Sequence, residues 1–151
     1  MGAVVREIEV AAPPEKVWEV VSDIDDEPEY WHGTREVINL RREGNVTERV
    51  IVQNFMGTRV EQRVTLNPKE SVDVDYLKGT TVGRKSVRIV GVGDSKCVVR
   101  ASWDVHFTGF LLLITPIIRN HIVKGTENAL ARIKEVAEGG RGPTAPSPGA
   151  S

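Results

Sequence analysis

The sequence predicts an α+β fold in which a curved antiparallel sheet of about seven strands wraps around one long C-terminal helix, with two short helices after the first strand. Three patterns predict it: two short helical segments near the start of the chain, strand-like alternation through its middle, and one long amphipathic segment near its end. A sheet with one apolar face and a long amphipathic helix can bury both apolar surfaces when the sheet curls around the helix.

The first elements are a strand and two short helices. Residues 4–10 form the strand, and Ala12-Pro-Pro-Glu begins a helix, because a proline in the first turn lacks only an N–H that has no partner there. A second helix is predicted over residues 24–31, capped by Ser22 or Asp23, with its opening acids at the positive end of the helix dipole. The buried side of the first helix consists of Val17, Trp18, Val20 and Val21.

Strands separated by turns fill residues 34–107, and Phe55-Met56-Gly57 suggests a tight hairpin. Segments 46–54 and 82–92 alternate poorly, so their faces stay unassigned. Apolar residues alternate clearly with polar ones in three other segments, whose inward faces are Val60, Gln62, Val64 and Leu66; Val72, Val74 and Tyr76; and Cys97, Val99, Ala101, Trp103, Val105 and Phe107.

The last helix begins at Thr115-Pro116, a capping residue followed by a first-turn proline, and runs to about Glu138. One domain is therefore predicted over residues 1–138, and the small, polar, proline-rich residues 139–151 are expected to form a disordered tail. The apolar stripe of the helix consists of Ile118, Ile122, Gly125, Ala129, Ile133 and Val136.

Composition narrows the classes of function. The formal net charge of −1 leaves no broad basic surface for nucleic acid, so no nucleic-acid partner is expected. The single cysteine, Cys97, has no partner for a disulfide or a zinc motif. A lone cysteine suits a reducing setting, and Arg6, Glu7 and Glu9 interrupt the apolar core that a signal peptide needs, so we expect a cytoplasmic protein.

The segment from Ala12 to Asp23, Ala-Pro-Pro-Glu-Lys-Val-Trp-Glu-Val-Val-Ser-Asp, resembles the opening helix of the START-related (SRPBCC) superfamily, which includes polyketide cyclases/aromatases and coenzyme Q-binding proteins. Glu29-Tyr30-Trp31 is similar to its second short helix and Val37-Ile38 to the start of its second strand, and the order of elements matches over residues 3–137. The resemblance implies a helix-grip fold with a hydrophobic cavity, and its motif says little about the ligand.

Carried over to this chain, the resemblance and the alternation select the same inward residues as a cavity lining. Ordinary core packing is the alternative for each of them. Small residues on opposing surfaces, Ala101 against Gly125 and Ala129, favour a cavity because they leave volume. The expected ligand-binding residues are Gln62, Val64, Val74, Tyr76, Val99, Ala101, Trp103, Ile118, His121, Ile122, Gly125 and Ala129.

Few polar residues fall on inward faces. Tyr76 either orients a ligand oxygen or is a core tyrosine, and His121, which borders the helical stripe, either contacts the ligand or lies in water at its flank. Alternation places no aspartate or glutamate inside, so no catalytic residue is assigned and a cyclase function is disfavoured. The acidic run 23–29 lacks the pattern of a calcium loop, and His32, His106 and His121 lack a metal-site spacing. We expect no metal and no cofactor.

Three functions remain open. The favoured one is binding or transport of a hydrophobic small molecule such as a lipid, an isoprenoid or quinone, or a polyketide-like compound. The first alternative is a polyketide cyclase/aromatase-type enzyme, and the second is a protein-interaction module that uses the apolar run from Phe110 to Ile114. That run either packs under the sheet edge or extends the last helix, or it forms a hydrophobic lip that contacts a membrane surface transiently, with Arg119 and Lys124 nearby.

Overall fold

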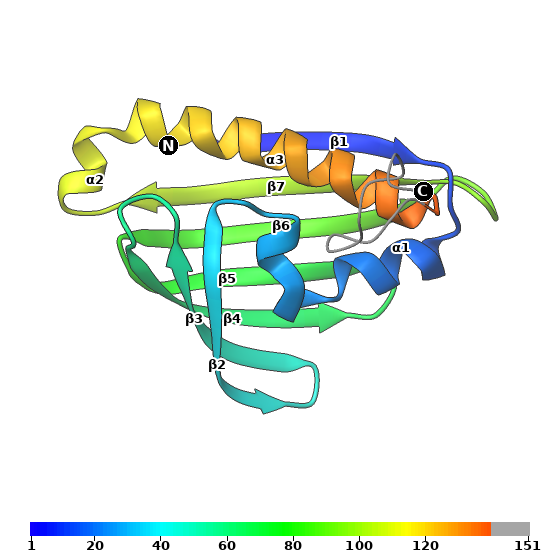
Figure 1. Ribbon diagram of the computed structural model, residues 1–151, viewed down its shortest axis with the longest axis horizontal. Helices are drawn as coiled ribbons and strands as arrows, with labels where there is room; N and C mark the ends of the chain where they lie inside the picture. The colour runs from blue at the N-terminus through cyan, green and yellow to red at the C-terminus, as the bar shows by residue number, and fades with distance from the viewer. Residues whose placement is uncertain (140–151) are drawn as a thin grey trace, which may run out of the picture.

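A computed structural model describes residues 1–139; the predicted tail, apart from Gly139, lies outside the described residues. Figure 1 shows one curved sheet beside a long helix. The elements are β1 (Val4–Val10), α1 (Pro14–Val21), the 3-10 helix η1 (Ile24–Glu29), β2 (Thr34–Glu43), β3 (Val46–Gln53), β4 (Arg59–Asn67), β5 (Ser71–Gly79), β6 (Thr81–Gly91), β7 (Cys97–Phe107), α2 (Phe110–Leu113) and α3 (Thr115–Ala137).

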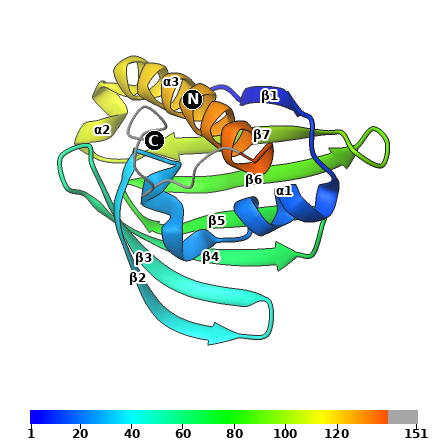
Figure 2. The ribbon, with the colours of Figure 1, turned by 45° about the vertical axis from the view of Figure 1, so that its right-hand side comes forward.

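The sheet has seven strands in the order β1-β7-β6-β5-β4-β3-β2, and every neighbouring pair is antiparallel. From β2 to β7 each strand pairs with the next one in sequence, while β1 joins the far edge beside β7. Helix α3 packs against β1, β7 and α1. Figure 2 shows α3, α1 and η1 on the same side of the curved sheet. The predicted α+β, helix-grip arrangement is confirmed.

The alternation predicted for β4, β5 and β7 is also confirmed. In β4, for example, Val60, Gln62 and Val64 are buried, whereas the residues between them are exposed. The two strands that the sequence left unassigned also have an inward face, and in each it carries a charged residue. Arg49 lies inside on β3, between the buried residues Thr47 and Ile51. The inward side of β6 consists of Thr81, Lys85, Val87 and Ile89.

The β3–β4 connection is the tight turn expected at Phe55-Met56-Gly57. Met56 and Gly57 have φ values of 59° and 62°, the left-handed pair that suits the twist of a hairpin. Gly83 on β6 serves a different purpose. A Cβ atom there would lie 2.3 Å from the carbonyl oxygen of Asp104, so glycine allows β6 and β7 to approach closely.

Three predictions about helix ends are wrong. Neither Ser22 nor Asp23 caps η1 through its side chain, and η1 is a 3-10 helix that ends at Glu29 rather than at residue 31. Thr115 is the first residue of α3, not its cap, and its hydroxyl donates back to the carbonyl oxygen of Leu112 at 2.8 Å. The extra turn α2 precedes α3, because Gly109 (φ 60°) redirects the chain after β7.

Candidate functional site

A cavity of about 470 Å³ lies between the inner face of the sheet and α3. Its accessible wall is mainly apolar and includes Trp31, Ile51, Phe55, Tyr76, Trp103, Phe107, Leu111, Ile118 and Ile122. Exposed polar residues line the wall at the η1–β2 connection, at the β3–β4 turn and on α3. We take these residues as the mouth of the cavity: His32, Asn54, His121, Lys124 and Asn128. This volume falls within the range of small-molecule sites in proteins, about 300–1,000 Å³.

The twelve residues selected from the sequence divide into two groups. Six of them line this cavity: Tyr76, Trp103, Ile118, His121, Ile122 and Gly125. His121 is exposed, and its ring lies 6.0 Å from that of Phe55 across the mouth. The other six are buried away from the cavity wall: Gln62, Val64, Val74, Val99, Ala101 and Ala129. Val74 instead borders a second hollow of about 30 Å³.

Packing explains this division. Val99 and Ala101 belong to the β7 half of the sheet that α1 and the C-terminal part of α3 cover, where they share a core cluster with Val17, Leu130 and Ala137. Alternation identifies which face of a strand points inward. It does not tell whether another element fills the space in front of that face.

Lys85 also lies at the cavity wall, although it was not among the residues predicted from the sequence. It is only 4% exposed, and it stands opposite Trp103 in the β6–β7 register. Its Nζ atom is 3.2 Å from the ring centroid of Trp31 and 4.7 Å from that of Trp103, so two indole faces hold the ammonium group. Among residues 1–139, Lys85 makes no hydrogen bond and no ion pair. Burial lowers the pKa of Lys85 to about 8, against the opposing attraction of Glu27.

The aromatic residues around Lys85 are themselves held in place. The rings of Trp31 and Trp103 meet edge to face at 6.2 Å, and Tyr76 lies 6.0 Å from Trp103. The indole Nε1 of Trp103 donates to Thr126 Oγ1 at 3.0 Å, and that hydroxyl donates to the carbonyl oxygen of Ile122 at 2.7 Å. Trp103 therefore ties β7 to α3 at the cavity wall.

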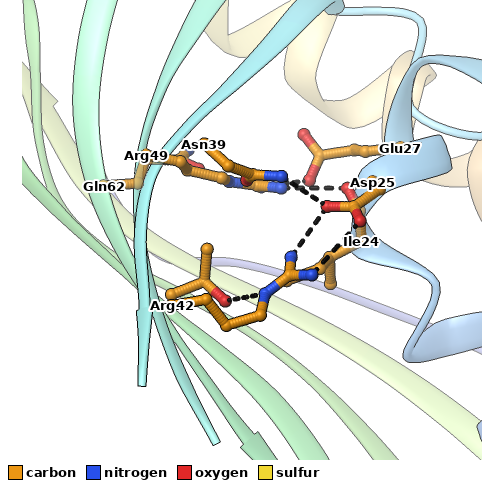
Figure 3. A network of polar contacts seen from close by, with 8 residues as sticks. Ile24, Asp25, Glu27, Asn39, Arg42, Arg49 and Gln62 are labelled. Atoms are coloured by element: carbon orange, nitrogen blue, oxygen red, sulfur yellow. Dashed lines mark hydrogen bonds and ion pairs between the residues drawn. The ribbon is translucent and has the colours of Figure 1, made fainter. Parts of the chain in front are cut away.

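A buried ion pair lies behind this wall. Arg49 is 1% exposed and Glu27 is 8% exposed, and Arg49 Nη2 approaches Glu27 Oε1 to 2.5 Å. Figure 3 shows the Arg49 and Gln62 side chains reaching from the sheet toward the helix that carries Glu27. Arg49 also donates to Gln62 Oε1 and to the carbonyl oxygen of Ile24, both at 2.9 Å, while Thr34 donates to Glu27 Oε2 at 2.6 Å.

This network corrects the expectation that no aspartate or glutamate lies inside, because Glu27, from the acidic run 23–29, is buried. Burial by itself raises the pKa of Glu27, but the positive charges of Arg49 and Lys85 outweigh it and hold the pKa below its usual value. Glu27 is therefore a carboxylate whose two oxygens are both engaged. Asp25, in contrast, lies at the surface and accepts hydrogen bonds from Arg42 and Asn39, both at 2.9 Å. Figure 3 shows these three side chains together.

Tyr76 faces the cavity as a neutral phenol. Burial, together with the negative charge of Glu27, raises the pKa of Tyr76 well above its usual value. It lies opposite Gly83 in the β5–β6 register, one inward position from the pair formed by Val74 and Lys85. Tyr76 and Lys85 are therefore diagonal neighbours on one face of the sheet, close enough to contact the same ligand.

One signal in the sequence could have identified Lys85. Counting back by two from the apolar residues Ile89 and Val87 leads directly to it. Arg49 had no such signal, because Val50 and Val52 on the opposite parity of β3 are also apolar. Its burial depends on Glu27, which comes from a different element.

Comparison with known proteins agrees with this architecture. The family model described as polyketide cyclase / dehydrase and lipid transport matches residues 1–138. The chain belongs to this family. It therefore also belongs to the START-related superfamily that the opening helix resembled. Comparison with curated protein sequences finds no significant match.

Several solved structures are similar to this protein over most of both chains. The Zhui aromatase/cyclase from Streptomyces sp. R1128 is 18% identical, with a TM-score of 0.67 over 93% of this chain and 99% of that one. A START superfamily protein from Mycobacterium smegmatis is 15% identical (TM-score 0.64; 87% and 98% covered). Norcoclaurine synthase from Thalictrum flavum, in complex with dopamine and hydroxybenzaldehyde, is 18% identical (TM-score 0.66; 93% and 89% covered). At these identities the likeness shows the fold.

The apolar run at the β7–α3 junction is mostly exposed. Leu111 is buried and lines the cavity, whereas Phe110, Leu112 and Leu113 are 59%, 60% and 79% exposed, and Ile117 on the next turn is 55% exposed. We call these four exposed side chains the apolar lip. None of the helices described between residues 1 and 139 has the length and hydropathy needed to cross a bilayer. No cluster of potential metal ligands occurs within the same residues.

Proposed function

We propose that this protein binds a hydrophobic small molecule in the cavity between α3 and the sheet, as a carrier or a sequestering protein. The observation that supports it is the hollow itself. Protein interiors are normally packed as densely as organic crystals, so a space of about 470 Å³ that the side chains do not fill forgoes side-chain contacts. An apolar ligand would restore those contacts, and the family description includes lipid transport.

Gly125 gives this proposal a sharp test. It lines the cavity from α3, and a Cβ atom added there would meet no heavy atom within 4 Å. A leucine at this position therefore occupies ligand space without forcing the fold apart. Ala131→Leu is the matched control, because Ala131 lies on the exposed side of the same helix.

The measurement is titration with the neutral fluorescent compound N-phenyl-1-naphthylamine, accompanied by native mass spectrometry of the purified protein. We expect the compound to bind, Gly125→Leu to weaken it at least tenfold, and Ala131→Leu to leave it unchanged. Any apolar molecule that co-purifies is expected to be lost from the Gly125→Leu protein alone. Failure of the wild-type protein to bind, or equal binding by both variants, would contradict the proposal.

A cyclase-type enzyme is the second candidate, because Lys85 and Tyr76 place an amine and a phenol on the wall of the cavity. The aromatase/cyclase and norcoclaurine synthase named above share this fold. Simple binding is favoured, because catalysis would need an available acid or base. Both oxygens of Glu27, the buried carboxylate behind this wall, are already engaged by Arg49 and Thr34. Mass spectrometry of a bound polyketide-like compound after incubation distinguishes the two: an unchanged mass supports binding, and loss of water supports the enzyme.

The apolar lip supports a further part of the proposal, transient contact with a membrane while the ligand enters or leaves. Its side chains project beside Leu111, which lines the cavity, and the exposed Arg119 and Lys124 lie on the following turns of α3. Apolar side chains flanked by basic ones are typical of surfaces that insert shallowly between anionic headgroups.

A further inference from the structure

We propose that the ligand is a hydrophobic molecule with a single negative charge, which lies against the Lys85 ammonium between Trp31 and Trp103. The inference rests on the proposed function, since it names the class of ligand for the same cavity. Glu27 and Arg49 form a closed pair whose charges cancel, so the protonated Lys85 leaves one positive charge uncompensated.

An uncompensated ammonium with little exposure is costly, because burial removes much of its water shell and it normally needs a charged partner with hydrogen bonds. The indole faces supply attraction but no hydrogen-bond acceptor, so the N–H donors of Lys85 have no acceptor among residues 1–139. Lys85 borders the cavity directly. A ligand anion there would accept these hydrogen bonds and neutralise the charge in one step, while its apolar part filled the remaining volume.

Thr81 indicates where the rest of the ligand lies. Its hydroxyl is buried, has no hydrogen-bond partner within the described residues, and belongs to a side chain that lines the same cavity. Thr81 and Lys85 are four residues apart on one face of β6, which separates them by about 13 Å. The two positions suit a molecule with an anionic head, an apolar body and a hydrogen-bonding group farther along.

Other charged groups do not supply the missing partner. The groups that face Lys85 are Glu27 from η1, Arg49 from β3 and Tyr76 from β5, and the charge of Glu27 is balanced by Arg49. His32, His121 and Lys124 are exposed at the mouth, and none of them carries a negative charge. Among residues 1–139, the cavity wall at Lys85 thus carries a net positive charge that no facing carboxylate neutralises.

Two dyes with one ring system test the inference. 8-Anilinonaphthalene-1-sulfonate is a permanent monoanion, and N-phenyl-1-naphthylamine is its neutral parent. Lys85→Met keeps an unbranched side chain and removes the charge, and Lys78→Met makes the same change at an exposed position on β5. We expect Lys85→Met to weaken the sulfonate roughly ten- to hundredfold, as loss of a charge-assisted hydrogen bond does, and to leave the neutral dye within about twofold.

The pH dependence of the wild-type protein provides a measurement that needs no variant. The sulfonate stays ionised throughout, so its affinity follows the protonation of Lys85, whose pKa is about 8 in the unliganded protein. We expect its affinity to fall roughly ten- to fiftyfold between neutral pH and about pH 10, as the protonated fraction of Lys85 drops to about one hundredth, and the neutral dye to show no such fall. In the Lys85→Met protein the sulfonate should lose this pH dependence.

The two proposals fail in different ways. If the neutral dye binds and is weakened by Gly125→Leu, but the sulfonate is unaffected by Lys85→Met and by pH, the cavity binds ligands and the anion inference is wrong. If neither dye responds to Gly125→Leu, the proposed function fails as well. Equal losses for Lys85→Met and Lys78→Met would also overturn the inference, because the effect would then reflect net charge rather than the buried site.

Discussion

Replacing Lys85 with methionine should make the unliganded protein more stable at neutral pH. In the folded chain Lys85 is 4% exposed, and burial lowers its pKa from 10.5 to about 8. At about 1.4 kcal/mol per pKa unit, that difference corresponds to a cost of ~3 kcal/mol for keeping the ammonium charged inside. Attraction to the faces of Trp31 and Trp103 returns about 1–2 kcal/mol. We therefore expect Lys85→Met to raise the free energy of unfolding by about 1–2 kcal/mol.

The direction of the pH dependence follows from the same numbers. Below about pH 8 both the folded and the unfolded chain hold the proton of Lys85, so the cost is fully present. Between pH 8 and 10.5 the unfolded chain binds more protons than the folded one, and the stability contributed by this group rises with pH. The stability advantage of Lys85→Met should therefore shrink as the pH rises through this window.

Urea titrations followed by tryptophan fluorescence measure both effects, with Lys78→Met as the exposed control that should change stability by no more than about 0.5 kcal/mol. A decrease in stability on replacing Lys85 at neutral pH would refute the reasoning, because it would mean that the lysine has a stabilising partner in the folded chain. An advantage that stays constant with pH would refute the role assigned to the charge. A gain in stability coupled to a loss of anion binding is the trade-off expected of a functional site.

Three further outcomes are expected. Arg49→Met leaves the carboxylate of Glu27 buried without its partner and should lower the free energy of unfolding by about 3–5 kcal/mol at neutral pH. The loss should shrink on acidification, because Glu27 then takes up a proton. Urea titrations at several pH values measure this effect, and an unchanged stability would contradict it. Gly125→Leu should raise stability by about 1 kcal/mol through helix propensity, visible as a higher Tm. Leu112→Asp should reduce co-sedimentation with anionic liposomes, whereas Leu40→Asp, which alters an equally exposed leucine on β2, should not.

The faces of three strands were predictable because side-chain direction along a strand is a local property. Successive residues point to opposite sides, so the apolar residues of β4, β5 and β7 identify the inward face without reference to any other element. The same holds for most of α3, in which Ile118, Ala129 and Ile133 are buried as the helical period requires. The predicted cap at Thr115 was wrong because the turn α2 precedes α3. The Thr115 hydroxyl donates to the carbonyl oxygen of Leu112 in that turn.

The charged residues of the site were not predictable in this way. Arg49 is buried because Glu27, 22 residues away in sequence, is brought against it by the position of η1 on the sheet. Either charge alone would be strongly destabilising inside the protein. Hydropathy, which considers one residue at a time, therefore predicts that both residues are exposed. Lys85 likewise depends on two indoles, one contributed by the segment after η1 and one by β7.

The sequence by itself determined the order of the elements, the α+β class, and the inward faces of its regular strands and of α3, since these follow from local backbone periods. Only the tertiary structure decided where the interior is hollow and where it is packed. Ala101 and Gly125 are both small and both inward, yet α1 and the end of α3 cover the first while the second borders the cavity. That difference depends on how distant surfaces meet, because the free space before a side chain is set by its neighbours in three dimensions.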